Sequence, residues 1–490
     1  MTIDIAIAKP ARQTLPALSA THLALTAACF ALLLAPALWN SYPLLQYDTG
    51  GYLARWYEGY LVPSRSTVFG LFLHLGEGLH FWPDLLLQTA CAIWVISLVL
   101  RVTGLAARPW HRIAVVTWLS LGTALPFLAS ALLTDIFAGV GVLALYLLIY
   151  HRPDLGRGDR IGLFFLIAFA VASHSATLAV LAAVLGFAAA CLPSDRRRMA
   201  MLLPGGGALA TGAAMLVATN FAFSGQLAWT PGGFGIAFGR MLQDGIVKHY
   251  LDEHCPNPRL KLCPYRDKLP ATADEFLWNG GVFNELGRFD GLGEEMRFIV
   301  LHSLQEYPVL QFETALAATT KQLGQFASGY GMHDQIEHTY GIIRRFISKE
   351  VPAMQHARQQ RGELNFNLIN RIHVPIAFGS MLFLLGLLVR AIRSGRFDEP
   401  ARLAVTVTVA ILANAFACGA LSGPHDRYGA RMVWIVAFTA AIAILRAIEN
   451  VLSERRRKPL GCTLRVSSAA IRELHDLRLM TDLSDSIGPR

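Results

Sequence analysis

The sequence predicts an all-α polytopic membrane protein with about ten transmembrane helices and a mainly helical extracytoplasmic domain. Composition is the first reason. Of 490 residues, 54% are hydrophobic and only 16% are charged, whereas a soluble domain carries about 25% charged residues. The mean hydropathy is +0.42. The second reason is a pattern, because long apolar runs recur along the chain and basic residues gather in alternate gaps between them.

Ten apolar runs are counted as membrane spans by their length. They begin near Leu23, Leu85, Ile113, Leu132, Ile161, Thr177, Met199, Val374, Leu403 and Met432. With the N-terminus inside, the inner loops are all basic, as the positive-inside rule requires. These loops are 101–112, 151–160, 195–198, 390–402 and the tail from 446. The positive-inside topology therefore explains the net charge of +9. The sequence has no basic, aromatic-rich soluble domain of the kind that binds nucleic acid.

This alternation divides the chain into five parts. They are a cytoplasmic N-terminus (1–19), an N-terminal transmembrane module (20–220) with an outer loop (40–82), an extracytoplasmic domain (221–370), C-terminal transmembrane helices (371–450) and a cytoplasmic tail (451–490). The large outer segment is polar and charged. Its Lys and Arg residues do not contradict the topology, because long domains translocate largely regardless of charge.

The first outer loop contains the run YPLLQYDTGGYLARWYEGY. Aromatic residues recur in it at every fourth position, which predicts one face of a short helix over 49–60. The stripe consists of Tyr52, Trp56 and Tyr60. Arg55 and Glu58 fall on the other side, so the helix suits the membrane interface. A second surface or re-entrant helix is expected over 66–79, which is apolar but too short to cross.

Three ionisable residues fall at the outer ends of spans, where such residues are costly and tend to be functional. Asp48 follows the first span, Asp135 opens the fourth, and His174 lies in the turn between the fifth and sixth. Each has a simpler explanation. The two aspartates suit helix N-caps, and on the same view the only role of His174 is to form ordinary hydrogen bonds within the turn.

A basic motif precedes the last span. Arg427 and Arg431 are four residues apart on one helical face, with Tyr428 beside them. Anchoring at the membrane interface is one explanation. However, positive residues on the outside run against the charge bias of the other loops. An anionic ligand on that side would account for them, and arginine is well suited to phosphate.

Two cysteines lie in the outer domain. Cys255 and Cys263 bracket the stretch CPNPRLKLC, and an oxidising compartment favours a disulfide between them. A metal site that uses His249 and His254 is the alternative. The sequence offers no second cysteine pair to complete a zinc set, so a disulfide is the favoured interpretation.

The outer face thus offers two carboxylates, a histidine and an arginine pair. A lipid-linked phosphate substrate fits this set. The arginines would hold the phosphate, the acyl chain would lie among the spans, and a carboxylate would act on the acceptor.

With these residues the chain resembles the GT-C superfamily of polytopic glycosyltransferases, which includes protein mannosyltransferases and the aminoarabinose lipid A transferase. The resemblance covers roughly residues 20 to 450 and is carried by short motifs. They are Tyr47-Asp48-Thr49 after the first span, the two surface helices, Trp82-Pro83-Asp84 before the second span, LLTD at Asp135, and RYGAR at 427–431.

The resemblance implies inverting transfer of a sugar from a polyprenyl-phosphate donor to a lipid, glycan or protein acceptor. Asp48 would be the general base or would orient the acceptor, and Asp135 a second acidic group. Arg427 and Arg431 would bind the lipid phosphate, with Tyr428 and His174 as further substrate contacts. Many members carry a paired DD or DE motif, whereas Thr49 follows Asp48 here, which leaves a divalent metal open.

The resemblance also implies an integral protein of a bacterial inner membrane, in contact with membrane lipid, with its site on the periplasmic face. Polar and aromatic residues of the outer domain are the candidates for contact with the acceptor. They are Trp278, Asn279, Tyr330, His333 and Asp334.

Two other classes stay open. One is a transporter or flippase for a lipid-linked or anionic solute, for which the Pro/Gly-interrupted run 203–207 is the one hint. The other is a polysaccharide polymerase or ligase, which would use the outer arginines on a lipid-diphosphate donor but would not specially need Asp48. The polar residues sit at span ends rather than at mid-depth, which favours surface chemistry over passage.

Overall fold

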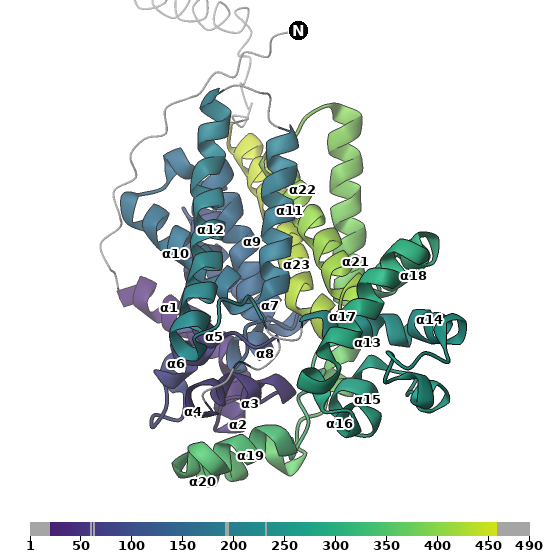
Figure 1. Ribbon diagram of the computed structural model, residues 1–490. Helices are drawn as coiled ribbons and strands as arrows, with labels where there is room; N and C mark the ends of the chain where they lie inside the picture. Colours follow the sequence, from purple (N-terminus) through teal and green to yellow (C-terminus); the bar gives the residue numbers. More distant parts are fainter. Residues whose placement is uncertain (1–19, 59–60, 62–63, 192–195, 231–232, 458–490) are drawn as a thin grey trace, which may run out of the picture. The chain divides into compact units, whose positions relative to one another are not determined.

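The computed structural model describes residues 20–457 apart from 59–60, 62–63, 192–195 and 231–232 (Figure 1). These residues form helices joined by turns and loops and contain no β-strand; Leu44 and Ala131 make an isolated parallel bridge. The chain divides into two compact units, residues 1–443 and 444–490. The expected N-terminus (1–19), Tyr60 and most of the expected tail (451–490) lie outside the described residues.

A helix covers each of the ten apolar runs. These helices are α1 (Ala20–Leu33), α6 (Trp82–Val102), α7 (Pro109–Gly122), α9 (Ile136–Tyr150), α10 (Arg157–Ser173), α11 (Ser175–Cys191), α12 (Arg196–Ser224), α21 (Phe366–Ser394), α22 (Glu399–Ala415) and α23 (Asp426–Arg457). In the part of the chain that the structure describes, five segments are long and apolar enough to cross a membrane, which makes this an integral membrane protein. They are Trp82–Val102, Met199–Ser224, Phe366–Ser394, Glu399–Ala420 and Asp426–Glu454.

The other five helices are shorter than the ten-span prediction requires. They have between 14 and 17 residues. At 1.5 Å per residue such helices are roughly 21–26 Å long, against a hydrocarbon core of about 30 Å. Ten full spans are therefore not shown. Residues at the ends of the closely spaced apolar runs form turns, which shortens the helices between them.

The first outer loop folds into four short helices, α2 (Ala35–Asn40), α3 (Tyr47–Leu53), α4 (Arg55–Glu58) and α5 (Thr67–His74). The single helix expected over 49–60 is interrupted at Ala54. Two of its aromatic residues, Tyr52 and Trp56, pack against other parts of the protein. Tyr52 packs edge-on against Phe69 of α5, with ring centroids 4.9 Å apart, and Arg55 is fully buried. A period of four identifies a buried face but does not say whether lipid or protein covers it.

The start of α3 is fastened to the segment that leads into α9. The amide of Leu44 donates to the carbonyl of Ser130 at 2.8 Å, and the amide of Leu132 donates back to Leu44 at 3.1 Å. The Thr49 hydroxyl donates to the Leu132 carbonyl at 3.1 Å. A short helix, α8 (Leu125–Ser130), enters this segment. The first loop and the start of α9 therefore hold a fixed register.

The large segment that the sequence predicts to lie outside the membrane, residues 221–370, is called the outer domain and has two parts in the structure. The first contains α13 (Gly233–Gln243), α14 (Ile246–His254), α15 (Ala273–Trp278), α16 (Val282–Glu285), α17 (Arg288–Glu306) and α18 (Pro308–Gln322), with the 3₁₀ turn η2 (Cys263–Lys268). Helices α13 to α17 share a core centred on Phe238, Tyr250, Phe276 and Ile299. Thr272 caps α15 by accepting from the Glu275 amide at 3.2 Å, as its capping-box pattern predicts. Cys255 and Cys263 form a disulfide.

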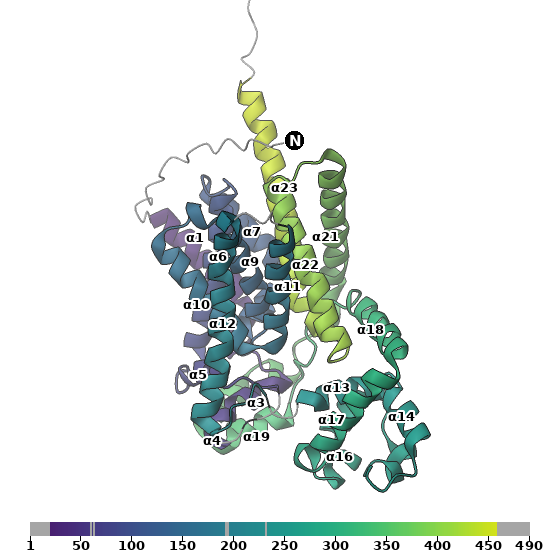
Figure 2. The same ribbon diagram turned by 45° about the horizontal axis from the view of Figure 1, so that its top comes forward.

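The second part lies beside α3 instead of joining that core. It contains α19 (Glu337–Phe346) and α20 (Val351–His356), with the 3₁₀ turns η3 (Ser348–Glu350) and η4 (Gln359–Arg361). Figures 1 and 2 both show α19 against α3, at the same end of the apolar helices. The Gly50 amide donates to the Thr339 hydroxyl at 3.0 Å, and that hydroxyl contacts the Gln46 carbonyl at 3.1 Å.

Two contacts join α18 to the start of α23. The Gln322 side chain both donates to the His425 carbonyl, at 3.0 Å, and accepts from the His425 amide, at 2.9 Å. Gly429 lets the helices approach closely, because a Cβ there would lie 1.8 Å from the Gln325 carbonyl oxygen. A π-helical turn, η5 (Phe416–Ala420), ends α22 next to α18. The outer domain therefore sets the position of residues 425–429. One further 3₁₀ turn is η1 (Arg152–Asp154).

We expect Gly50→Ala to separate α3 from α19. A Cβ at Gly50 would lie 2.7 Å from the Thr339 Cα, and overpacking of this kind costs about 1–3 kcal/mol. The thermal unfolding midpoint of the detergent-purified protein should fall. Gly341→Ala in α19 is the matched control, since nothing lies within 4 Å of its Cβ position, and it should leave the midpoint unchanged or raise it. Equal midpoints for the two variants would contradict the close packing.

Candidate active site

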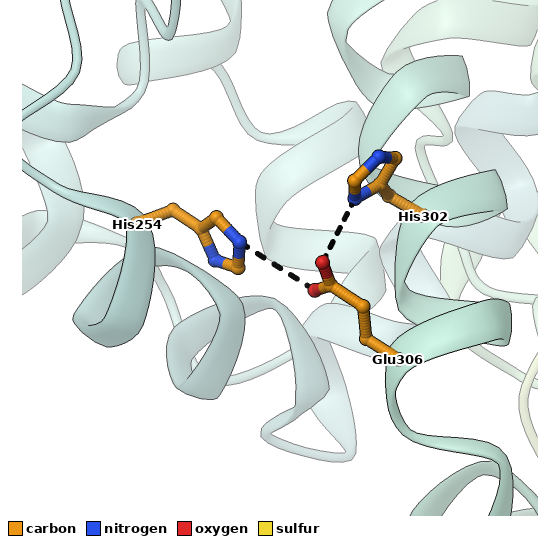
Figure 3. A group of neighbouring side chains, drawn as sticks. All are labelled: His254, His302 and Glu306. Atoms are coloured by element: carbon orange, nitrogen blue, oxygen red, sulfur yellow. Dashed lines mark hydrogen bonds and ion pairs between the residues drawn. The ribbon is translucent and has the colours of Figure 1, made fainter.

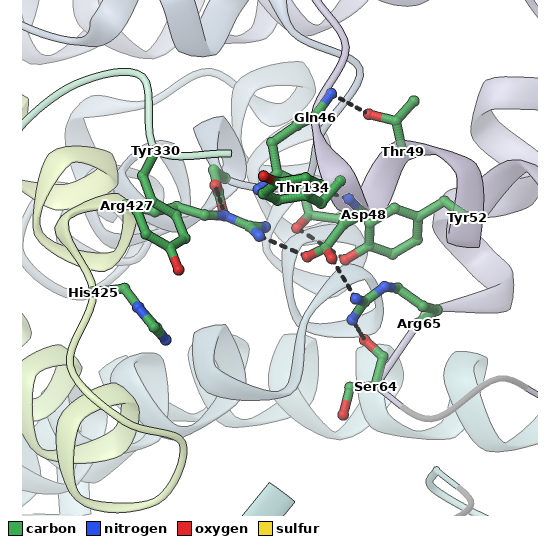
Figure 4. Close-up of polar contacts among 12 residues, drawn as sticks. Gln46, Asp48, Thr49, Tyr52, Ser64, Arg65, Thr134, Tyr330, His425 and Arg427 are labelled. Atoms are coloured by element: carbon green, nitrogen blue, oxygen red, sulfur yellow. Dashed lines mark hydrogen bonds and ion pairs between the residues drawn. The ribbon is translucent and has the colours of Figure 1, made fainter. Parts of the chain in front are cut away.

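Asp48 points into a cluster of charged side chains and does not cap its helix (Figure 4). The N-cap of α3 is Gln46, whose Oε1 accepts from the Asp48 amide at 2.7 Å. The Asp48 carboxylate therefore makes no capping bond and pairs with two arginines instead. Its Oδ2 accepts from Nη1 of Arg427 at 2.6 Å, and its Oδ1 accepts from Nη2 of Arg65. The side chain of Asp48 is 16% exposed.

Asp135 occupies the N-cap position of α9 but makes no capping bond. Its carboxylate instead accepts from Nε of Arg427 at 2.5 Å and from Nη2 at 3.3 Å. Nη1 of Arg431 lies 3.6 Å away as an ion pair. The side chain of Asp135 is only 1% exposed, so it is almost completely removed from solvent.

The Arg427 guanidinium therefore bridges two carboxylates that come from distant parts of the chain. Its planar fork holds Asp135 with one edge and Asp48 with another nitrogen, a geometry for which arginine is suited. Three guanidinium groups, those of Arg65, Arg427 and Arg431, face the two carboxylates. The cluster thus carries one excess positive charge, and an anion would neutralise it.

The pKa of Asp48 reflects this environment. Burial by itself raises the pKa of a carboxyl, but the guanidinium groups of Arg65 and Arg427 outweigh burial and lower the pKa of Asp48 to about 2. Asp48 is therefore ionised at neutral pH and a weak base while both arginines hold it. Release of an arginine would make it a better proton acceptor.

Arg431 is fully buried and lies behind Arg427. Its Nε and Nη2 donate to Oδ1 of Asn414 at 3.2 and 2.7 Å. Its guanidinium lies 5.4 Å from the ring centre of Tyr428, and the Tyr428 hydroxyl is 3.3 Å from that of Ser422. Direct contact of Arg431 with a substrate does not fit this burial, whereas support of Asp135 does.

His174 joins the cluster from the junction of α10 and α11. Burial, together with the guanidinium groups of Arg431 and Arg427, lowers the pKa of His174 to about 3, so its ring is neutral beside the two carboxylates. Its Nδ1 is buried and has no hydrogen-bond partner. The six residues singled out in the sequence, Asp48, Asp135, His174, Arg427, Tyr428 and Arg431, are therefore gathered in one region.

Arg65 is a member of the cluster that sequence reasoning missed. It lies between α4 and α5, and its guanidinium is 5.8 Å from the ring centre of Tyr52. A Cβ at Gly51 would lie 3.1 Å from its Nε, so glycine leaves it room. The signal was present, because an arginine in an outer loop breaks the charge bias as Arg427 does.

A small pocket opens beside Arg427 and Asp135. Apolar side chains form one wall, and the loop after α18 contributes another. The residues that line the pocket include Phe127, Leu128, Leu133, Tyr330, Asp135 and Arg427. The cavity has a volume of about 20 Å³, which is room for about one water molecule, so a larger ligand would have to move the side chains that line it.

Of the five acceptor-contact candidates in the outer segment, Tyr330 reaches this pocket. Its ring lies 4.9 Å from that of His425, and its hydroxyl donates to Asp274 at 3.3 Å. Trp278 packs near Phe289 and His333 near Tyr47. Neither of these, nor Asn279 or Asp334, lines the pocket.

The carboxylates of this cluster do not fit a divalent metal. Every carboxylate oxygen of Asp48 and Asp135 contacts a guanidinium group, and the cluster already has excess positive charge. A divalent cation would have to displace arginines against that charge. The chemistry of the site therefore depends on its arginines.

Comparison with known proteins yields one distant match. No family model matches the chain, and no curated protein matches it. Among solved structures, the chain is similar to the archaeal oligosaccharyltransferase AglB from Archaeoglobus fulgidus, in complex with an inhibitory peptide and a dolichol-phosphate. The identity is 14%, the TM-score is 0.43, and the match covers 94% of this chain and 54% of that chain. This chain thus spans about half the length of AglB, and the case for a function rests on the residues of the site.

We expect Asp135→Asn to destabilise the protein more than Asp48→Asn. The first change leaves the buried guanidinium groups of Arg427 and Arg431 without their closest counter-charge, and breaking a buried pair costs about 3–5 kcal/mol. Asp48 is more exposed, so its loss costs less. Unfolding in detergent with increasing dodecyl sulfate measures both. The exposed Asp334→Asn is the control and should change little; an Asp135→Asn variant as stable as this control would contradict the assignment.

Acid should weaken the fold partly through Asp48. Its pKa is about 2 in the folded protein and about 3.9 in an unfolded chain. Its stabilising effect is therefore complete above about pH 5 and is lost as pH falls through 4 towards 2. The unfolding midpoint of the wild type should drop over this range more steeply than that of Asp48→Asn. Parallel pH curves would show that Asp48 has no such linkage.

Proposed function

We propose that this chain is a membrane glycosyltransferase of the GT-C type. It transfers a sugar from a polyprenyl-phosphate donor to an extracytoplasmic acceptor and inverts the configuration of the anomeric carbon. One observation carries the proposal. Arg427 bridges Asp48 and Asp135 within a cluster that has excess positive charge, beside a pocket with an apolar wall.

The donor phosphate would bind at the arginines. Nη1 of Arg427 now holds the Asp48 carboxylate at 2.6 Å, and a phosphate oxygen can take the place of that carboxylate oxygen. Arg65 offers a second guanidinium on the other side of Asp48. The lipid chain would leave along the apolar side chains of Phe127, Leu128 and Leu133.

Binding of the phosphate would also prepare the base. When Arg427 pairs with the phosphate, Asp48 loses one of the two charges that lower its pKa and can accept a hydrogen bond from the acceptor hydroxyl. The acceptor oxygen then forms a bond to the anomeric carbon as the bond from that carbon to the phosphate oxygen breaks. The proton goes to Asp48, and the electron pair leaves with the polyprenyl phosphate.

The leaving phosphate gains negative charge in this step, and Arg427 is positioned to stabilise it. Preorganised charge of this kind is commonly the largest contribution to catalysis. Asp135 and Arg431 are assigned as positioning residues, because their burial keeps them behind Arg427. This revises the catalytic role expected for Asp135 and the substrate contact expected for Arg431. His174 and Tyr428 remain proposed contacts at the edge of the site.

The acceptor is a lipid, glycan or protein that reaches the site from outside. Tyr330 is the proposed acceptor contact, since it lines the pocket from the loop after α18. We place the protein in a bacterial inner membrane with the site on the periplasmic face. A polymerase or ligase with a lipid-diphosphate donor is the second candidate, because the excess positive charge would also suit a diphosphate.

A transfer assay with detergent-purified protein and a panel of radiolabelled polyprenyl-phosphate sugars tests the function. We expect one donor to be consumed by the wild type. Asp48→Asn should lower the transfer rate at least about 100-fold, the scale of general-base catalysis, while the donor still binds. Arg427→Ala should lose donor binding as well.

Two exposed residues serve as matched controls. Asp334→Asn and Arg344→Ala remove the same charges away from the cluster and should transfer at the wild-type rate. Transfer by Asp48→Asn at the wild-type rate would remove Asp48 as the base. If the wild type consumes no polyprenyl-phosphate sugar, lipid-diphosphate donors and then transport in proteoliposomes are the next assays.

A further inference from the structure

A second group of chemically active side chains lies in the outer domain, away from the charged cluster. His254, His302 and Glu306 each offer a ligand atom, and these atoms lie within 4.8 Å of one another (Figure 3). Nε2 of His254 is 3.5 Å from Oε2 of Glu306. Nδ1 of His302 is 3.1 Å from Oε1 of the same carboxylate. None of the three takes part in the proposed transfer reaction.

Two helix ends bring these residues together. His254 is the last residue of α14, and Glu306 is the last residue of α17, with His302 one turn earlier. The C-terminal end of a helix carries partial negative charge and attracts cations. Two such ends meet at this group. Both helices pack into the shared core of the domain, through Tyr250 and Ile299 among others, so the group does not depend on a loose loop.

Both imidazole rings are held in place before any ligand arrives. The His254 ring stacks on that of Tyr250, with centroids 4.1 Å apart and an interplanar angle of 11°. The His302 ring stacks on that of Phe298, with centroids 4.8 Å apart. In addition, Nδ1 of His254 is 2.9 Å from the Tyr250 carbonyl oxygen. A carbonyl only accepts, so this nitrogen carries the proton.

That hydrogen bond determines what His254 presents to Glu306. With the proton on Nδ1, Nε2 of the neutral ring has a lone pair, and it points at a carboxylate oxygen. In that state two acceptors face one another, so either a proton on Nε2 or a metal cation has to lie between them. A backbone carbonyl that binds the far nitrogen of a histidine is also the usual way in which a metal ligand is oriented.

We propose that His254, His302 and Glu306 bind a zinc ion that links α14 to α17. Two histidines and one glutamate are a known zinc ligand set, with a fourth position left to water. Ligand atoms about 2.0–2.1 Å from a tetrahedral zinc lie about 3.3 Å apart. The side chains are 29%, 43% and 32% exposed, so small rotations bring them to that spacing and water reaches the ion.

The ion would act beside the disulfide. Cys255 follows His254 directly and is bonded to Cys263. The disulfide closes the loop after α14, and the zinc ion would fasten the end of α14 to α17. By joining the two helices, the ion would stabilise the outer domain that holds the start of α23.

Zinc content after dialysis, measured by mass spectrometry on the full chain in detergent, tests the site. We expect the wild type to retain about one zinc ion per chain. His302→Gln and Glu306→Gln should bind zinc at least about tenfold more weakly. His249→Gln is the matched control. His249 lies on the same helix and pairs with Glu253 at 3.3 Å, but it is not part of the group.

Unfolding separates loss of the ion from loss of the fold. Added zinc should raise the midpoint of the wild type and of His249→Gln, since a ligand that binds the folded state stabilises it, and should not raise that of His302→Gln. For variants that do not fold, histidine modification of the wild type by diethyl pyrocarbonate gives the answer. Zinc should protect His254 and His302 and leave His249 reactive.

Two results would overturn the zinc site. One is a wild type that retains no more zinc than a double variant with glutamine at positions 254 and 302. The other is equal loss of zinc in His249→Gln and His302→Gln. Either would leave the group as a histidine–carboxylate pair without a metal. These measurements need no donor or acceptor, so they stand whether or not the chain transfers a sugar.

Discussion

The ion pairs of Arg427 with Asp48 and Asp135 are the constraint on which the outer end of this protein depends. Charges removed from water cost several kcal/mol each unless partners are held in good geometry. The surrounding contacts supply that geometry. The Leu44–Ala131 bridge fixes the first loop against the start of α9, and the Gly50–Thr339 bond fixes α3 from the other side. Gln322 holds the start of α23. Hydrogen bonds to the backbone beside Asp48, Asp135 and Arg427 thus fix where these three side chains start.

The outer domain is part of this scaffold, and its first part also has a hydrophobic core of its own. Its core is closed by α13 to α17, while α18 reaches the start of α23 and α19 reaches α3. A change in the domain can therefore reach the cluster through backbone contacts that involve no charged residue. The proposed zinc ion would act at this level, because it would fix α14 and α17 without contact with a substrate.

Sequence reasoning found the carboxylates and Arg427 for a physical reason. Ionisable residues are rare at the expected outer ends of the spans, so each one stands out there. The same criterion applied to Arg65 would have found it. The partners of Arg431 could not be found this way, because Asn414 and Cys418 are ordinary residues on a neighbouring helix. The period of the aromatic stripe could not identify its partners, since it is the same against lipid and against protein; Tyr52 packs on Phe69 of α5. His254 was noticed, but its partners lie on another helix and only the fold joins them.

The charge of the cluster implies an order of events. In the structure both oxygens of Asp48 are engaged by arginines, and these charges make the carboxylate a weak base towards an acceptor hydroxyl. An anionic donor changes this, because it competes for Arg427 and satisfies the excess positive charge. The same ion pair then has two roles. It stabilises the empty protein, and under the proposed function it would keep Asp48 from acting as a base until the donor is bound. Donor binding before acceptor binding would then follow from the competition between the donor phosphate and Asp48 for Arg427.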